Sequence, residues 1–390
     1  MDYTKYISKV TQLIPPSGIR KYFDYIDKDT ISLGVGEPDF PTPEGIRQEA
    51  LQRLSTGRIP YSSNAGMPEL REWIGKYLDA RFGLKDYAVG DILVTVGASQ
   101  AIDLTVRALT NPGDEIIIPE PTYVSYVPAV MLSGGKPVII PTKAETGFKM
   151  TPDCVLAALT PKTKAILIPY PNNPTGGIME YSDLQKIADI AIEHDLMIIS
   201  DEIYAELTYN GKRHVSIAAL PGMRERTVVL NGFSKAFSMT GWRLGYAAGP
   251  TPLIAAITKL HQLTMLCAPT PAQYAGIAAI RQGFENNWSD VLYMKNEYDK
   301  RRRYMVDTFD SMGLMCHEPE GAFYVFPCVK STGLSSEEFC DRLLHQKKVV
   351  AVPGSAFGKS GEGHIRCCYA TDIEAIREAL ERIKEFLKTL

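Results

Sequence analysis

The sequence has few cysteines and histidines, and their spacing matches no disulfide or metal pattern. Its seven cysteines are scattered, and only Cys367 and Cys368 are neighbours. It contains no Cys-x-x-Cys pair, and its six histidines show no His-x-x-x-His spacing. A disulfide framework and a zinc site are therefore unsupported, and no metal is expected. We expect reduced, mostly buried thiols that contribute to packing.

Strong charge and long apolar runs are also lacking. The formal net charge is −3 and no basic block occurs, which argues against a nucleic-acid partner. Apolar runs such as Leu196–Ile199 have the length of a strand and are far too short to span a bilayer. The stretch Met1–Lys5 lacks the charged and then apolar layout of a signal peptide. We therefore expect a cytoplasmic protein that does not associate with membranes.

Between about residues 90 and 250, short apolar runs alternate with segments of helical period. The predicted strands are Ile92–Val96, Glu115–Pro119, Pro137–Ile140, Lys164–Ile168, Met197–Ser200, Thr227–Leu230 and Leu244–Ala248. The predicted helices among them are Ser99–Leu109, Val124–Leu132 and Ser182–His194. This alternation predicts an α/β fold whose mainly parallel sheet is covered by helices.

The length of 390 residues exceeds what one hydrophobic core usually serves, so two domains are expected. Later helices are predicted at Pro252–Met265, Pro271–Gly283, Trp288–Met312 and Ile373–Leu390, and strands at Ala322–Pro327, Val349–Val352 and Ile365–Tyr369. We place a large domain at residues 48–290. Residues 1–47 and 291–390 form a smaller α+β domain, with the proline-containing N-terminal arm over the cleft.

A lysine and an arginine stand eight residues apart within Asn231–Gly245. A lysine that does covalent chemistry needs a partly desolvated position, because a protonated ammonium is not a nucleophile. Lys235, just past an apolar run, is a candidate for this role. Arg243 suits a phosphate, because its planar fork can bind two oxygens. A pyridoxal-phosphate enzyme needs both groups. Each residue alone is more often solvated at a surface.

Two further motifs follow predicted strands, where α/β proteins bind ligands. Gly97, Ala98 and Ser99 open a helix, so their backbone N–H groups and the Ser99 hydroxyl suit a phosphate. An ordinary helix start is the other interpretation. The Pro171–Gly177 loop would point the Asn173 amide at a ligand oxygen, with a cis Asn173–Pro174 bond, or would be a simple turn.

Two charged residues complete the candidate set. Asp201 ends an apolar strand, where a carboxylate is costly unless it is paired, and a cationic pyridinium nitrogen is a suitable partner. The other interpretation of Asp201 is a helix or loop cap. Arg366, flanked by strand residues, is placed to bind a carboxylate. The other interpretation of Arg366 is a solvated edge-strand residue.

In this order, the motifs resemble those of the class I/II aminotransferases, which have the type I fold of pyridoxal-phosphate enzymes. The resemblance runs from about residue 15 to the C-terminus. The chain is most similar to the branch of aspartate, aromatic and N-acetyl-diaminopimelate aminotransferases, through the stretches Ser17–Arg20, Gly36–Phe40, Ser238–Arg243 and Gly321–Tyr324. The resemblance implies a seven-stranded sheet, pyridoxal 5′-phosphate as cofactor and transfer of an amino group from an amino acid to a 2-oxo acid.

The resemblance also implies roles for individual residues. Lys235 matches the lysine that is linked covalently to the cofactor. Asp201 matches the partner of the pyridine nitrogen, and Tyr204 and Asn173 match donors to the ring hydroxyl oxygen. The substrate carboxylate is expected at Arg366, with Asn173 and Gly36 beside it. The residues that match the remaining cofactor contacts are Gly97, Ala98, Ser99, Ser234 and Arg243 at the phosphate, and Tyr123 stacked on the ring.

Tyr61 matches a tyrosine that reaches the phosphate of the other subunit, which implies a homodimer with shared active sites. Some positions depart from the family pattern. Gly232 replaces a common serine, Tyr123 replaces the tryptophan of some members, and no arginine is assigned to the distal carboxylate of a dicarboxylic substrate. Ile19, Tyr22 and Phe23 are candidates to line a pocket for apolar or aromatic side chains.

Two other functions are compatible with parts of the pattern. The same scaffold hosts carbon–sulfur β-lyases and cyclising synthases, which Lys235 alone does not distinguish from a transaminase. A non-catalytic regulator would retain the aminotransferase-like domain as an effector sensor. Such regulators usually carry a DNA-binding domain ahead of it, and too few residues precede Ile31 for one, so we expect the enzyme.

Overall fold

The computed structural model describes residues 1–16, 18, 19, 27–55 and 57–390. Its largest feature is a seven-stranded sheet with the strand order β2-β8-β7-β6-β5-β3-β4. β8 runs antiparallel to both of its neighbours, and all other pairs are parallel. The predicted α/β fold with a mainly parallel sheet is therefore confirmed. The strands are β2 (Ile92–Thr95), β3 (Glu115–Glu120), β4 (Lys136–Pro141), β5 (Thr163–Ile168), β6 (Met197–Asp201), β7 (Thr227–Gly232) and β8 (Gly245–Ala248).

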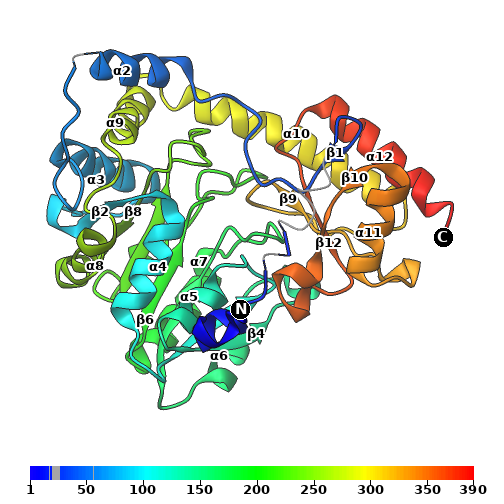
Figure 1. Cartoon of the computed structure of the whole chain (residues 1–390), viewed down its shortest axis with the longest axis horizontal. Coiled ribbons are helices and arrows are strands. Elements are labelled where there is room, and N and C mark those ends of the chain that lie inside the picture. Colours follow the sequence, from blue (N-terminus) through cyan, green and yellow to red (C-terminus); the bar gives the residue numbers. More distant parts are fainter. Residues whose placement is uncertain (17, 20–26, 56) are drawn as a thin grey trace.

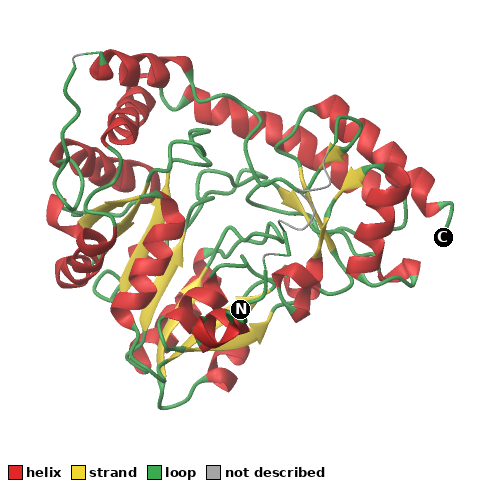
Figure 2. Ribbon diagram, viewed as in Figure 1, coloured by secondary structure: helices red, strands yellow, loops and turns green. Residues whose placement is uncertain are grey.

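Successive strand residues point to opposite sides of the sheet, and apolar residues are buried on both sides. Helices therefore cover both faces. Ile116 and Ile118 of β3 belong to one core cluster with α4, α5 and α8. Ile117 faces the other way and packs with α6 and α7, and α3 and α9 cover β2, β7 and β8 on that second face. Figure 1 shows α4 in front of the strands, and Figure 2 shows the same layers by secondary structure. The helices are α3 (Pro68–Phe82), α4 (Gly97–Leu109), α5 (Tyr126–Leu132), α6 (Pro152–Ala158), α7 (Tyr181–Glu193), α8 (Thr251–Thr264) and α9 (Thr270–Glu285).

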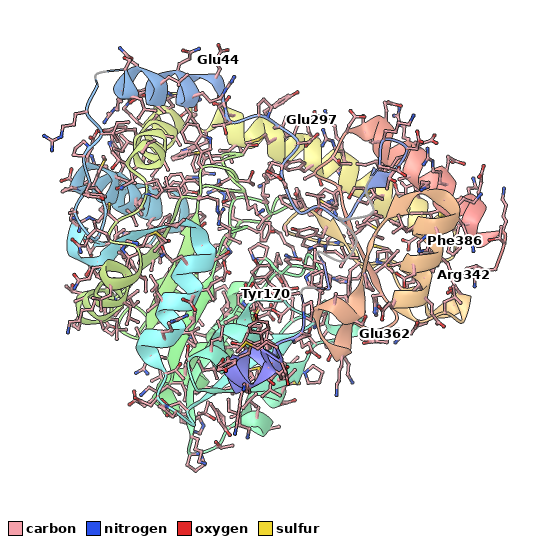
Figure 3. All side chains as sticks on the ribbon, in the orientation of Figure 1. Glu44, Tyr170, Glu297, Arg342, Glu362 and Phe386 are labelled. Atoms are coloured by element: carbon pink, nitrogen blue, oxygen red, sulfur yellow. The ribbon has the colours of Figure 1, made fainter. Side chains whose placement is uncertain are left out.

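The C-terminal part has its own core and also takes up the N-terminal strand. β1 (Ile31–Ser32) pairs in parallel with β10 (Val349–Val350). β12 lies between β11 and β9 in a three-stranded antiparallel sheet. The long helix α10 runs along both parts of the molecule in Figure 1, and Phe386 of α12 is labelled in the C-terminal part in Figure 3. The other elements here are β9 (Tyr324–Val325), β11 (Val352–Pro353), β12 (Ile365–Cys368), α10 (Ser289–Ser311), α11 (Ser336–Lys347) and α12 (Ile373–Leu387).

The structure adds detail that the sequence patterns did not predict. The expected strand Ala322–Pro327 is limited to Tyr324–Val325, and Val349–Val352 splits into two short strands at Ala351. Helices α2 (Glu44–Leu54), α3, α6 and α11 were not predicted. In α2 only Ile46 and Ala50 are buried, so its apolar period is too sparse to recognise. α1 (Lys9–Leu13) lies against α5. The domain limits at residues 48 and 290 stay a prediction.

One edge of the sheet gathers the chemically important loops. The carboxyl ends of the parallel strands β2, β5, β6 and β7 meet there, as does the start of the antiparallel strand β8. Gly245 pairs with both Thr95 and Gly232. This register brings the turn before β8 next to the start of α4 and next to the loop after β7. Among the described residues, no helix is both long and apolar enough to cross a membrane.

Candidate active site

A cavity of about 380 Å³ opens at this edge of the sheet. Its walls come from the loops after β2, β5, β6 and β7, from the segment around residue 36, and from β9 and β12. Tyr170, labelled near the centre of Figure 3, immediately precedes the Pro171–Gly177 loop. The cavity brings together the predicted site residues Gly36, Ala98, Ser99, Tyr123, Asn173, Asp201, Tyr204, Ser234, Lys235, Arg243 and Arg366.

Lys235 projects into the cavity from the turn after β7. Its Nζ donates a hydrogen bond to the Gly36 carbonyl oxygen at 2.7 Å. Desolvation of the ammonium in the cavity lowers the pKa of Lys235 to about 8. An amine with this pKa is uncharged in an appreciable fraction of molecules near neutral pH, so Lys235 is suited to act as a nucleophile or as a base.

Asp201 lies at the end of β6 and is only 4% exposed. Burial raises the pKa of Asp201 to about 6, although two hydrogen bonds favour its ionised form. The Tyr126 hydroxyl donates to Oδ2 at 2.7 Å, and the Ile203 backbone N–H donates to Oδ1 at 3.1 Å. Asp201 therefore presents an oriented carboxylate to the cavity. A loop-cap bond to Ile203 is also present, so the two interpretations of Asp201 coexist.

The start of α4 and Arg243 form a cationic cradle. Gly97 adopts φ +75°, and a Cβ at this position would meet the Arg243 Nη2 atom at 2.5 Å. The guanidinium therefore lies directly against the first residue of the helix. Ser99 and Ser234 line the same cavity. Free backbone N–H groups at a helix N-terminus, the helix dipole and a guanidinium all favour an anion, and a phosphate group fits this combination.

Arg366 lines the same cavity and is held by two hydrogen bonds. It is 2% exposed, which excludes the solvated edge-strand interpretation. Its Nη1 atom donates to Asn173 Oδ1 at 2.9 Å, and Nη2 donates to the Gly34 carbonyl oxygen at 2.6 Å. The Asn173–Pro174 peptide bond is cis, as the sequence suggested. A guanidinium fixed in this way and facing a cavity is suited to bind a carboxylate.

Some predicted residues lie elsewhere. Gly97 lies behind Arg243 and does not line the cavity, and Tyr61 is 81% exposed on the surface of the single chain. Arg20, Tyr22 and Phe23 lie outside the described residues, whereas Ile19 lines the cavity as expected.

Several cavity residues were missed at the sequence level. Tyr126 and Tyr324 contact predicted site residues, and Val35 and Glu37 line the cavity. Glu37 and Tyr324 belong to the stretches Gly36–Phe40 and Gly321–Tyr324, which carried the resemblance without a role being assigned. Tyr126 is the first residue of α5, and its ring makes an edge contact with the Tyr123 ring at a centroid distance of 5.6 Å.

Comparisons with known proteins agree with this geometry. Residues 28–383 match the family model described as aminotransferase class I and II. The Bacillus subtilis protein YugH is 53% identical over 98% of this chain and 99% of its own length. An aspartate aminotransferase from Pyrococcus abyssi is 46% identical over 96% of this chain and 97% of its own. The crystal structure of an aromatic aminotransferase from Pyrococcus horikoshii OT3 superposes with a TM-score of 0.90 at 44% identity, covering 95% and 99% of the two chains.

The family match spans nearly all of the sequence, and the relatives align along almost their full length. No comparison supports the lyase alternative. The family's cofactor is pyridoxal phosphate, and Lys235, Asp201 and Arg243 line one cavity. The chain is therefore a transaminase that belongs to the class I and II aminotransferase family.

Proposed function

We propose that this enzyme binds pyridoxal 5′-phosphate in the cavity and transfers the amino group of an apolar or aromatic amino acid to a 2-oxo acid. The observation that carries the proposal is the position of the Lys235 amine, which shares one cavity with Asp201, Arg243 and Arg366. These residues offer a nucleophile, a buried carboxylate and two separate anion sites. Such a set suits a cofactor phosphate at one end and a substrate carboxylate at the other.

The residues present fit the cofactor. The phosphate would be held by Arg243, Ser234, Ser99 and the backbone N–H group of Ala98, which all line the cavity. Gly97 does not line the cavity and would contribute by its close approach to Arg243 at the start of α4. Tyr123 would stack on the ring. When bound, pyridoxal phosphate supplies an aldehyde that links to amines and a ring that accepts the electron pair left at the substrate Cα. The buried Asp201 carboxylate would keep a proton on the ring nitrogen.

The chain's own residues supply binding and proton transfer. The Arg366 guanidinium would grip the α-carboxylate of the amino acid, with Asn173 beside it. The Lys235 amine would act as the base that takes the proton from the substrate Cα and as the acid that returns a proton within the cavity. The Tyr204 hydroxyl would donate to the ring oxygen. Proton transfer by placed groups of this kind typically contributes on the order of 100- to 10,000-fold in rate.

The cavity favours a substrate side chain without a second carboxylate. Among the described residues that line it, the cations are Lys235, Arg243 and Arg366, and each already has a role. Glu37 also lines the cavity and would repel an added carboxylate. The apolar lining residues include Ile19, Val35, Ile102 and Val124. Relatives named for aspartate and for aromatic amino acids both occur, and this lining supports the aromatic or apolar class.

A homodimer with shared sites is proposed from the surface position of Tyr61. The loop around Tyr61 is firmly held although its side chain is exposed. Thr270 Oγ1 donates to the Pro60 carbonyl oxygen at 2.9 Å, and Gln273 Nε2 donates to Ser62 Oγ at 2.9 Å. Tyr61 therefore lies between two residues whose positions are fixed, and its side chain does not line the cavity of its own chain. This supports a role for Tyr61 at the cofactor phosphate of a second subunit.

Replacing Lys235 with Ala is expected to abolish transamination and to leave cofactor binding measurable, because the cradle and Asp201 remain. The loss should exceed about 100-fold, since both the nucleophile and the base are removed. Activity and cofactor absorbance after dialysis would be measured in parallel. Lys186, an exposed lysine on α7, provides the matched Lys186→Ala control, which should be fully active. Borohydride labelling at a residue other than Lys235 would contradict the assignment.

The Asp201→Asn variant should stabilise the cofactor-free protein. The pKa of Asp201 rises from 3.8 to about 6 on folding, which corresponds to about 3 kcal/mol against the ionised form. Ionisation of Asp201 therefore lowers the stability of the folded protein as the pH rises from about 3.8 to about 6. The gain from Asp201→Asn should be about 3 kcal/mol at pH 7.5 and about half of that at pH 5. Urea unfolding at pH 5 and pH 7.5 measures the difference in unfolding free energy between the variant and the original protein. An equal difference at the two pH values would rule out the buried carboxylate as its cause.

Aromatic amino acids should be better donors than aspartate. Phenylalanine, tyrosine, leucine and aspartate would each be tested with 2-oxoglutarate and with pyruvate as acceptor. Because a second carboxylate would lie unpaired near Glu37, kcat/KM for aspartate should be at least about 10-fold lower than for phenylalanine. A preference for aspartate would refute the proposed substrate class without affecting the assignment of Lys235.

Mixing two impaired variants tests the shared site. In a dimer with shared sites, a Lys235→Ala chain still supplies an intact Tyr61 to a Tyr61→Ala partner. One of the two sites in each mixed dimer is then complete. Co-refolded or co-expressed variants should show activity at low cofactor concentration that neither variant shows alone. Activity equal to the sum of the separate variants would mean that Tyr61 does not act across subunits.

A further inference from the structure

Tyr324 occupies a position between the two halves of the active site. It lies in β9, is 1% exposed and lines the cavity. Its hydroxyl lies 2.8 Å from the Tyr204 hydroxyl. Its ring centroid lies 4.4 Å from the guanidinium carbon of Arg366. One side chain therefore contacts both the residue proposed to face the cofactor ring and the residue proposed to bind the substrate carboxylate.

The role proposed for Tyr204 sets the direction of its hydrogen bond with Tyr324, since either hydroxyl could donate at 2.8 Å. A tyrosine hydroxyl carries one proton, so if Tyr204 donates to the cofactor oxygen, its own oxygen is free to accept from Tyr324. Tyr324 would then donate to Tyr204, which in turn would donate onward. Donors linked in this way polarise one another, and each bond is strengthened. A Cβ at Gly36 would overlap the Tyr324 hydroxyl, so a glycine at position 36 leaves the space that this arrangement needs.

The ring contact fixes the guanidinium plane. Two donors on Arg366 are already engaged by Asn173 and Gly34, and the rings of Tyr324 and Phe357 lie over the guanidinium at 4.4 and 4.9 Å. Stacking of an arginine on aromatic faces is favourable, and more so where water is excluded. The Tyr324 ring thus restricts the tilt of Arg366, whose buried Nε atom has no hydrogen-bond partner among the described residues.

We propose that Tyr324 is a positioning residue that acts on both halves of the reaction, with its hydroxyl serving Tyr204 and its ring serving Arg366. The proposal rests on the functions proposed above for Tyr204 and Arg366. It differs from simple packing in one respect. The two effects belong to different atoms of one side chain, so they can be removed separately.

Two variants of the cofactor-loaded enzyme separate the effect of the Tyr324 hydroxyl from the effect of its ring. Tyr324→Phe keeps the ring and removes the hydroxyl, whereas Tyr324→Leu removes both. The first measurement is the pH midpoint of the absorbance change of the bound cofactor. The second is the dissociation constant of 3-phenylpropanoate, a carboxylate that cannot react, determined by calorimetry. Tyr369→Phe is the matched control, because Tyr369 is buried in the same core and its hydroxyl donates to the Ala322 carbonyl oxygen instead.

Tyr324→Phe should raise the pH midpoint by on the order of a few tenths of a unit, because a weakened Tyr204 donor stabilises the anionic ring oxygen less. It should leave the dissociation constant unchanged. Tyr324→Leu should raise the midpoint and also weaken 3-phenylpropanoate binding by about 2- to 30-fold, the range expected for loss of a cation–π contact. Tyr369→Phe should change neither quantity.

An unchanged midpoint in Tyr324→Phe, or unchanged binding in Tyr324→Leu, would overturn the proposal. Tyr324→Met replaces the leucine variant if that protein does not fold, with the same expectations. Tyr204→Phe and Arg366→Ala distinguish this failure from failure of the proposed function. If Tyr204→Phe leaves the midpoint unchanged, or Arg366→Ala leaves binding unchanged, then the role of Tyr204 or Arg366 is wrong, and the proposal for Tyr324 falls with it.

Discussion

The withdrawal of the Lys235 amine from bulk water is the constraint around which the site is organised. Desolvation lowers its pKa to about 8, and among the described residues Nζ donates its hydrogen bond to a neutral acceptor, the Gly36 carbonyl oxygen. A carboxylate in contact with this amine would favour the ammonium and remove its nucleophilic character. The carboxylate of Asp201 is instead bound by Tyr126 and the Ile203 backbone, so two opposite charges share one cavity without neutralising each other.

The antiparallel strand β8 determines the position of Arg243, the second charged residue of the Lys235 motif. Lys235 and Arg243 are joined by a short turn, and pairing of Gly245 with both Thr95 and Gly232 places that turn at the start of α4. A Cβ at Gly245 would lie 2.5 Å from backbone atoms of Gly97 and Ala98, so the close approach depends on glycine at this position. The antiparallel direction of β8, and not proximity in sequence alone, thus brings Arg243 to the start of α4.

The sequence predicted the central sheet well, because Ile- and Val-rich strands buried on both faces give continuous apolar runs. Cavity-lining residues at strand ends, such as Asp201 and Asn173, were recognisable from the combination of residue type and position. Tyr126 was not recognisable as a cavity residue, since a tyrosine in the first turn of a helix is usually a packing residue. The role of Tyr324 depends on a contact with Arg366, which is 42 residues away in the chain, and no local pattern encodes it. The short helix α2 was missed because its apolar face is narrow.

Arg366 is bound by Asn173 and by the Gly34 carbonyl oxygen, so it is fixed by the middle and the beginning of the chain. The cradle and the lysine, in contrast, are encoded between residues 97 and 245. The residues that fix the Arg366 guanidinium therefore come from different stretches of the polypeptide than Lys235 and the cradle. A backbone shift at Gly34 would release one of the guanidinium nitrogens without moving the lysine or the cradle.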